Sequence, residues 1–179
     1  MNTVKYDGYA LEFASDNLKR DREIVMAAVK DRRWALRFTS DNLMREKEIV
    51  MAAVKQEWNA RRLASEDLKR EREIEMAAVN QYGGALKFAS EDLQRDREIV
   101  MAAVKQSRWA LEFSSLEPQG DCDVVLEEAK HNSSSLPYAN LTRLARDITT
   151  SPAKFCKILS CFHSITSIFN LIRENPKTF

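Results

Sequence analysis

The chain contains the stretch Asp21-Arg22-Glu23-Ile24-Val25-Met26-Ala27-Ala28-Val29 and repeats it, with small changes, from Glu46, Glu71 and Asp96. The copies follow one another at steps of 25 residues without an insertion, and a more divergent fifth copy begins at Asp121. A fixed period of this size is typical of stacked units that share one core. Such proteins act mostly by presenting a surface, so the repeat bears on function as well as on fold.

Each repeat carries two apolar blocks separated by a polar stretch. In the first repeat the apolar blocks are residues 9–14 and 24–29. Ser15 and Asp21 stand where side-chain oxygens can cap the start of a helix. Proline, which breaks helices, is absent from residues 1–117. The sequence therefore predicts an all-α fold.

The polar stretch decides between one long helix and several short ones. A continuous coiled coil needs an apolar residue about every third or fourth position, and positions 19–23 supply none. We therefore expect each repeat to be a helical hairpin: a short helix near 8–14, a turn around 15–20 and a longer helix near 21–31. Stacked hairpins of this kind form a small solenoid.

The longer helix is expected to make the contacts between repeats. Its six consecutive apolar residues cover most of its circumference, so neighbouring helices must flank it on two sides. Leu11, Phe13 and Leu18 are expected to fill the groove beside it. The recurrent alanines allow close helix contacts at equivalent positions, which are Ala28, Ala53, Ala78 and Ala103.

The composition changes after the array. We expect a repeat array of about five units over 1–130, a linker at 131–137 and a C-terminal helical segment at 138–179. This last segment carries a broad apolar stripe between Phe155 and Ile172. The stripe predicts either a cap that packs on the last repeat or a helix that binds a partner or a second copy of the chain.

Charge and cysteine usage exclude several classes of protein. The net charge is +1, from 28 basic and 27 acidic residues, which argues against a strong hold on nucleic acid. The chain has three cysteines and two histidines, without the spacing of a metal site. We therefore predict no metal, no cofactor and no catalytic residue. No stretch is long and apolar enough for a membrane span, and the N-terminus lacks the apolar core of a signal peptide.

The repeat also resembles a known family. The unit Ala-Leu-x-Phe-Ala-Ser-x-x-Leu-x-x-Asp-Arg-Glu-Ile-Val-x-Ala-Ala-Val-Lys-Gln is similar to a tandem repeat classed as a domain of unknown function, which is frequent in secreted effector proteins of Legionella and in protists. The resemblance covers about residues 8–130. It implies a small all-helical array without an assigned catalytic residue.

The resemblance has a further implication for function. A relative built almost entirely of such repeats binds and inhibits bacterial enzymes that deamidate or transglutaminate ubiquitin and its conjugating machinery. By this resemblance the chain is expected to regulate another bacterial effector enzyme of the ubiquitin pathway. The expected location is the cytoplasm, or a host cell reached by a route without a cleaved signal peptide.

Departures from the pattern mark candidate binding residues. In the third repeat Arg61 replaces a recurrent leucine and Glu75 replaces a recurrent valine, beside Trp58. These departures predict either a local binding patch or an ion pair at a half-exposed site. Tryptophan and arginine are common anchors of protein interfaces, although tryptophans also wedge neighbouring units together. The remaining candidates for partner binding are Arg33, Trp34, Arg108 and Trp109.

Three functions stay open on the residues alone. The favoured one is a non-catalytic protein–protein interaction module that inhibits a partner enzyme. A second is a structural protein that self-associates, as a homodimer, through its C-terminal segment. A third is an RNA-binding helical repeat, which the matching of recurrent arginines by recurrent acids disfavours.

Overall fold

A computed structural model describes residues 8–32, 34–107, 109–131 and 139. In these ranges every regular element is a helix and no strand is formed, which confirms the all-α prediction. The chain divides into two compact units, Met1–Ala85 (unit 1) and Leu86–Phe179 (unit 2). The predicted linker at 131–137, apart from His131 at the end of helix α10, lies outside the described residues. The predicted C-terminal segment also lies outside them, apart from Ala139.

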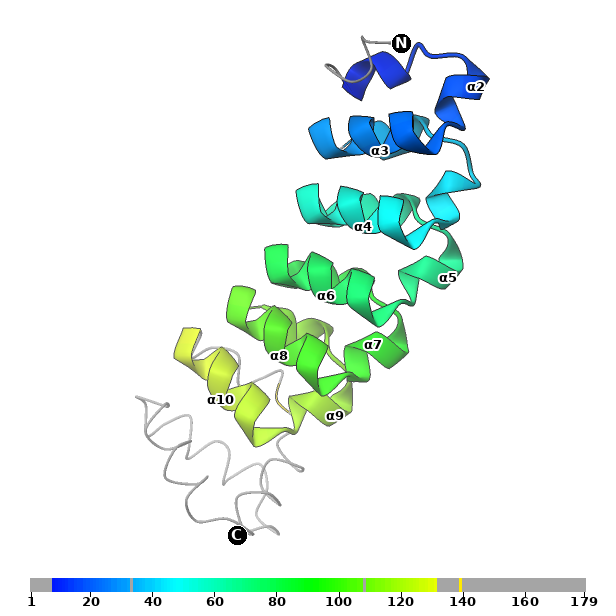
Figure 1. The fold of residues 1–179 in the computed structure, drawn as a ribbon. Helices are drawn as coiled ribbons and strands as arrows, with labels where there is room; N and C mark the ends of the chain where they lie inside the picture. Colours follow the sequence, from blue (N-terminus) through cyan, green and yellow to red (C-terminus); the bar gives the residue numbers. More distant parts are fainter. Residues whose placement is uncertain (1–7, 33, 108, 132–138, 140–179) are drawn as a thin grey trace, which may run out of the picture. The chain divides into compact units, whose positions relative to one another are not determined.

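Unit 1 holds three repeats, each with the same order of elements (Figure 1). A 3-10 helix (η) comes first, a one-turn helix follows, and a ten-residue α-helix closes the repeat. The elements are η1 (Gly8–Leu11), α2 (Asp16–Lys19) and α3 (Arg22–Asp31); η2 (Ala35–Phe38), η3 (Leu43–Arg45) and α4 (Lys47–Gln56); η4 (Trp58–Leu63), α5 (Glu66–Lys69) and α6 (Arg72–Gln81).

Unit 2 repeats the same order. Helix η5 (Gly83–Phe88) carries the boundary between the two units. The later elements are α7 (Glu91–Arg95), α8 (Arg97–Gln106), η6 (Ala110–Phe113), α9 (Leu116–Gln119) and α10 (Cys122–His131).

The repeat differs from the expected hairpin in two ways. The segment predicted as a short α-helix near 8–14 forms a 3-10 helix, and the segment predicted as a turn contains the one-turn helix α2. Asp21 caps α3 as expected: its carboxylate accepts hydrogen bonds from the amides of Glu23 and Ile24 at 3.0 and 3.1 Å. These two bonds fix the start of α3 at the beginning of its apolar block.

The core is made by the same four positions of each long helix. In α3 these are Ile24, Val25, Ala28 and Val29, all of which are buried. Helix α4 contacts α3 on one side and α6 on the other, and α8 contacts α10 within unit 2 (Figure 1). The recurrent alanines Ala28, Ala53, Ala78 and Ala103 are fully buried, as close helix contacts require.

Successive repeats are also joined through the backbone. In unit 1 the amide of Ser40 donates to the carbonyl of Lys19 at 3.1 Å, and the amide of Ser65 donates to the carbonyl of Met44 at 3.2 Å. In unit 2 the amide of Ser115 donates to the carbonyl of Gln94 at 3.1 Å. Within each unit these bonds link neighbouring one-turn segments and fix their register.

The first repeat corrects one expectation about the core. Leu11 is fully buried, but the side chain of Phe13 is 86% exposed instead of filling a groove. Leu18 is half-buried. Among the described residues, no helix is long and apolar enough to cross a membrane.

Candidate protein-binding surfaces

The two residues that break the pattern of the third repeat form a buried ion pair. Helix η4 supplies Arg61 and helix α6 supplies Glu75, and an Nη2–Oε2 distance of 2.8 Å joins them. Their side chains are 3% and 0% exposed. A partner protein cannot touch either side chain in this conformation, because both occupy core positions. Of the two alternatives that the sequence left open, the structure contains the ion pair. The pair is buried, whereas a half-exposed site was expected.

Burial affects the protonation of this pair. It raises the pKa of Glu75 from 4.5 to about 7, and the nearby guanidinium of Arg61 offsets only part of the rise. Glu128 on α10 is similarly buried, and burial raises its pKa to about 7. A hydrogen bond with the backbone of Leu111 offsets part of this rise in the pKa of Glu128.

The aromatic candidates lie beside the 3-10 helices. The Trp58 ring packs on the Tyr82 ring with centroids 5.0 Å apart and planes tilted by 37°. Trp58 is half-buried, whereas Tyr82 is 49% exposed. Trp34 is half-buried in unit 1 and Trp109 is exposed in unit 2. Arg33 and Arg108 lie outside the described residues.

A glycine makes room for the Tyr82 ring. A Cβ added to Gly84 would lie 2.5 Å from Cε1 of Tyr82, closer than real side-chain contacts allow. Glycine at this position therefore permits the ring to fold back over the backbone and meet Trp58. The sequence signal was the pair Gly83-Gly84, which stands in this repeat alone at the corresponding place.

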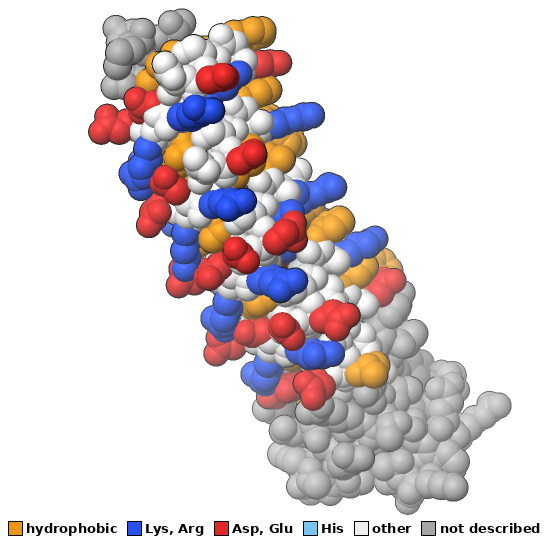
Figure 2. All heavy atoms as spheres, turned by 90° about the vertical axis from the view of Figure 1, so that its right-hand side faces the viewer, with side chains coloured by type: hydrophobic (Ala, Val, Ile, Leu, Met, Phe, Trp, Pro, Cys, Tyr) orange, Lys and Arg blue, Asp and Glu red, His pale blue; other side chains and the backbone are white. Residues whose placement is uncertain are grey.

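Large apolar side chains thus gather on the 3-10 side of unit 1. We call this surface the 3-10 face and define it by Phe13, Trp34, Phe38, Trp58, Leu63 and Tyr82. Phe38 and Leu63 occupy the same repeat position as Phe13 and are half-buried. Figure 2 shows hydrophobic side chains at the surface, many of them beside Lys and Arg. In unit 2 the same position holds Phe88, which is exposed, and Phe113, whose ring lies 5.4 Å from Nζ of Lys87.

A ladder of ion pairs runs along the N-terminal ends of the long helices. In unit 1 the side chain of Arg22 reaches Glu46 at 2.9 Å and Glu48 at 4.0 Å on the next helix. Lys47 repeats the pattern one helix later, with Glu71 at 3.3 Å and Glu73 at 3.0 Å. The hydrogen bonds that the Lys47 ammonium donates to the carboxylates of Glu73 and Glu71 raise the pKa of Lys47. These exposed pairs neutralise the charges at this end of the stack (Figure 2).

Unit 2 has the same ladder in a tighter form. Arg97 contacts Asp121 and Asp123, each at 2.8 Å. Hydrogen bonding and charge attraction from Asp121 raise the pKa of Arg97. The recurrent cations at these positions are therefore already paired within the protein, which makes them poor contacts for phosphate groups.

A shallow groove of about 430 Å³ lies on the side of α3 and α4 that faces away from their buried residues. We call it the methionine groove; it is lined by Met26, Lys30, Glu48, Met51, Ala52, Lys55 and Gln56. Met26 and Met51 are half-buried, and the two lysines are exposed. Sequence reasoning missed this site. The signal was present in the Met-Ala pair and the lysine that recur after each buried Ile-Val pair.

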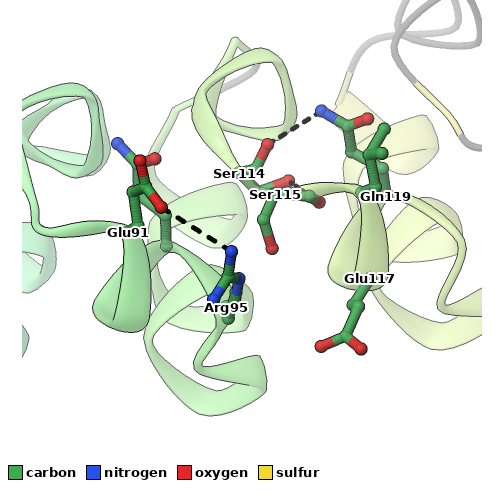
Figure 3. A pocket seen from close by; sticks show the side chains of 8 residues that line it. Glu91, Arg95, Ser114, Ser115, Glu117 and Gln119 are labelled. Atoms are coloured by element: carbon green, nitrogen blue, oxygen red, sulfur yellow. Dashed lines mark hydrogen bonds and ion pairs between the residues drawn. The ribbon is translucent and has the colours of Figure 1, made fainter.

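Unit 2 holds a larger polar pocket of about 640 Å³ between α7 and α9 (Figure 3). Its amide side chains are engaged with the backbone: Gln94 donates to the carbonyl of Leu86 at 3.1 Å, and Gln119 donates to the carbonyl of Ser114 at 2.8 Å. Arg95 pairs with Glu91 at 3.7 Å. The pocket side chains therefore mainly hold the turn segments in place.

No group of three or more His, Cys, Asp or Glu side chains within the described residues could hold a metal ion. The side chain of Cys122 is buried. The described residues offer exposed apolar side chains, a shallow groove and a polar pocket.

These features define a class: an all-α helical-repeat protein with a repeating core and apolar surfaces. The chain matches a family described as a domain of unknown function, DUF4116, over residues 1–44, 34–69 and 71–118. Because these matches span more than half of the chain, the protein belongs to this family. Neither a curated protein nor a solved structure matches the chain.

Proposed function

We propose that this protein is a non-catalytic interaction module that binds a partner protein through the 3-10 face of unit 1 and regulates it by stoichiometric binding. The observation that carries the proposal is the exposure of large apolar side chains on that face. Phe13 and Tyr82 remain open to solvent, while the apolar core positions of the same repeats are fully buried. An exposed apolar cluster of this kind is a common feature of protein-binding sites.

The composition of the face supports the same function. Tryptophan and tyrosine supply much of the binding energy in protein interfaces. Trp58 and Tyr82 support each other by ring contact, so part of the face is ordered before a partner arrives. A preorganised surface loses less conformational entropy on binding.

The family resemblance supports a more specific form of the proposal. We expect the partner to be a bacterial effector enzyme that deamidates ubiquitin or transglutaminates it, and we expect binding to inhibit it. In this form the protein acts as an effector regulator, in the bacterial cytoplasm or inside a host cell.

A titration with purified enzymes tests this function. Ubiquitin deamidases and ubiquitin transglutaminases of bacterial origin are assayed against increasing amounts of the full chain. We expect the activity of a true partner to fall until equimolar protein is present and then to stay constant. If no enzyme of either class binds or changes its rate, the ubiquitin-pathway proposal is wrong.

Substitutions on the 3-10 face locate the surface. Phe13→Ala and Tyr82→Ala should each weaken binding by about 2 kcal/mol, or roughly thirtyfold in Kd. Phe88→Ala is the matched control, because it removes the same kind of exposed ring from unit 2. Helicity and Tm should stay unchanged in all three variants. Equal loss of affinity in the control would contradict a site confined to unit 1.

A further inference from the structure

The methionine groove lies on a face of α3 and α4 that the 3-10 face does not use. One side of α3 is buried in the core and is formed by Ile24, Val25, Ala28 and Val29. Met26 and Lys30 lie on the opposite side of the helix. Helix α4 repeats this arrangement with Met51 and Lys55. The groove is therefore independent of Phe13, Trp58 and Tyr82.

The two ends of the groove differ in charge. At the N-terminal end Glu48 already lies 4.0 Å from Arg22 in the ion-pair ladder. At the C-terminal end Lys30 and Lys55 are exposed, and neither forms an ion pair with a described residue. The groove thus presents two unneutralised ammonium groups at one end and a partly neutralised carboxylate at the other.

The floor of the groove suits an apolar side chain. Met26 and Met51 come from neighbouring helices, and Ala52 also lines the groove. Methionine side chains are flexible and polarizable, so they adapt to guests of different shape. In α6 the corresponding methionine, Met76, is followed by Asn80 instead of lysine, so the basic edge ends at Lys55 within unit 1.

We propose that the methionine groove binds a short acidic, amphipathic segment of a protein partner. An apolar side chain of that segment enters between Met26 and Met51, and carboxylates of the segment pair with Lys30 and Lys55. The positive charge of Lys30 and Lys55 at the C-terminal end of the groove favours an acidic segment over a basic one. The apolar floor disfavours a purely polar segment. This surface is additional to the 3-10 face.

The spacing within the groove defines the partner's pattern. Met26 and Lys30 are four residues apart on one helix, as are Met51 and Lys55, so the Cβ atoms of each pair are about 6 Å apart. A partner helix matches this spacing when an apolar residue and an acidic residue are separated by one turn. The long helices span about 15 Å, so a segment of about ten residues fills the groove.

The probe is a cross-linked model helix of about ten residues with leucines on one face and glutamates one turn away. The full chain is labelled at the methyl groups of its six methionines and observed by NMR during titration. We expect the signals of Met26 and Met51 to move. The signal of Met44, which does not line the groove, should stay in place.

Charge exchange provides the decisive control. A second helix with lysine in place of each glutamate should bind about tenfold more weakly. The variant Lys30→Glu with Lys55→Glu should reverse this preference, while Lys105→Glu in unit 2 should leave it unchanged. Phe13→Ala should also leave it unchanged, because Phe13 lies on the other face.

Three outcomes would overturn the proposal: no movement of the Met26 and Met51 signals, equal binding of the two helices, or movement confined to other methionines. The result is separate from the test of the proposed function. An array that inhibits an enzyme but does not bind the acidic helix would retain the 3-10 face and lose the groove. If the chain binds the acidic helix but inhibits no enzyme, the proposal for the methionine groove is kept and the proposed function is rejected.

Discussion

Two substitutions in the third repeat place an ion pair where other repeats have leucine and valine. Arg61 and Glu75 are both buried, and removing one partner of such a pair leaves an uncompensated charge. Arg61→Leu should therefore lower the free energy of unfolding by about 3–5 kcal/mol at pH 8. The double variant Arg61→Leu with Glu75→Val restores the apolar pattern and should be at least as stable as the natural chain. Urea denaturation of the three proteins measures this, and a double variant less stable than Arg61→Leu would contradict it.

The same pair predicts how stability depends on pH. The pKa of Glu75 is raised to about 7 in the folded chain, above its ordinary value of 4.5. The folded state therefore holds its proton more strongly, so this contribution is complete below about pH 4.5 and is lost as the pH rises to about 7. A shift of this size corresponds to about 3 kcal/mol.

The check is Tm measured between pH 4.5 and 8. Glu75→Gln should reduce the fall in Tm across this window. Part of the fall should remain, because burial also raises the pKa of Glu128 to about 7. An identical pH profile in the two proteins would show that Glu75 is ionised throughout the window.

At the scale of the element, the caps of the long helices are not equivalent. The carboxylate of Asp21 accepts two amide hydrogen bonds at the start of α3, whereas Glu46 makes no such bond at the start of α4. Asp21→Ala should lower the free energy of unfolding by about 1 kcal/mol. Glu46→Ala removes only an exposed ion pair with Arg22 and should cost less. Chemical denaturation compares the two, and equal losses would contradict the role of the cap.

The packing of the long helices gives a second prediction at this scale. Ala53 is fully buried on α4, which contacts both α3 and α6. Ala53→Leu should overpack this contact and cost about 1–3 kcal/mol. Ala52→Leu, on the half-buried face of the same helix, is the matched control and should cost less. An unchanged Tm in Ala53→Leu would contradict the stacking contact.

The elements also show what the sequence could predict. The ten-residue helix α3 followed from six consecutive apolar residues and a capping aspartate. The 3-10 helices could not be predicted in the same way. A segment of about four residues, some apolar and some polar, fits a 3-10 turn and an α-helical turn equally well. The helical turn α2 was predicted as a turn for the same reason: its four residues are too few to show a period.

The whole molecule explains why the candidate site was only partly predictable. The 25-residue repeat indicated an array that presents a surface. Trp58 and Trp34 could be picked out from the sequence as candidate binding residues, Trp58 because it lies beside the two departures from the repeat pattern. A periodic column predicts one environment for every copy, yet Phe13 is 86% exposed whereas Phe38 and Leu63 at the same repeat position are half-buried. The burial of Arg61 and Glu75 depends on distances between helices, which the order of residues does not contain.

The central claim is that a partner protein covers the 3-10 face of unit 1. Hydrogen–deuterium exchange of the full chain, alone and bound to an enzyme that it inhibits, tests this directly. We predict slower exchange in η2 and η4 and at Tyr82 in the complex, with unchanged exchange in the one-turn helix α5. Protection confined to α5, or to unit 2, would contradict the account.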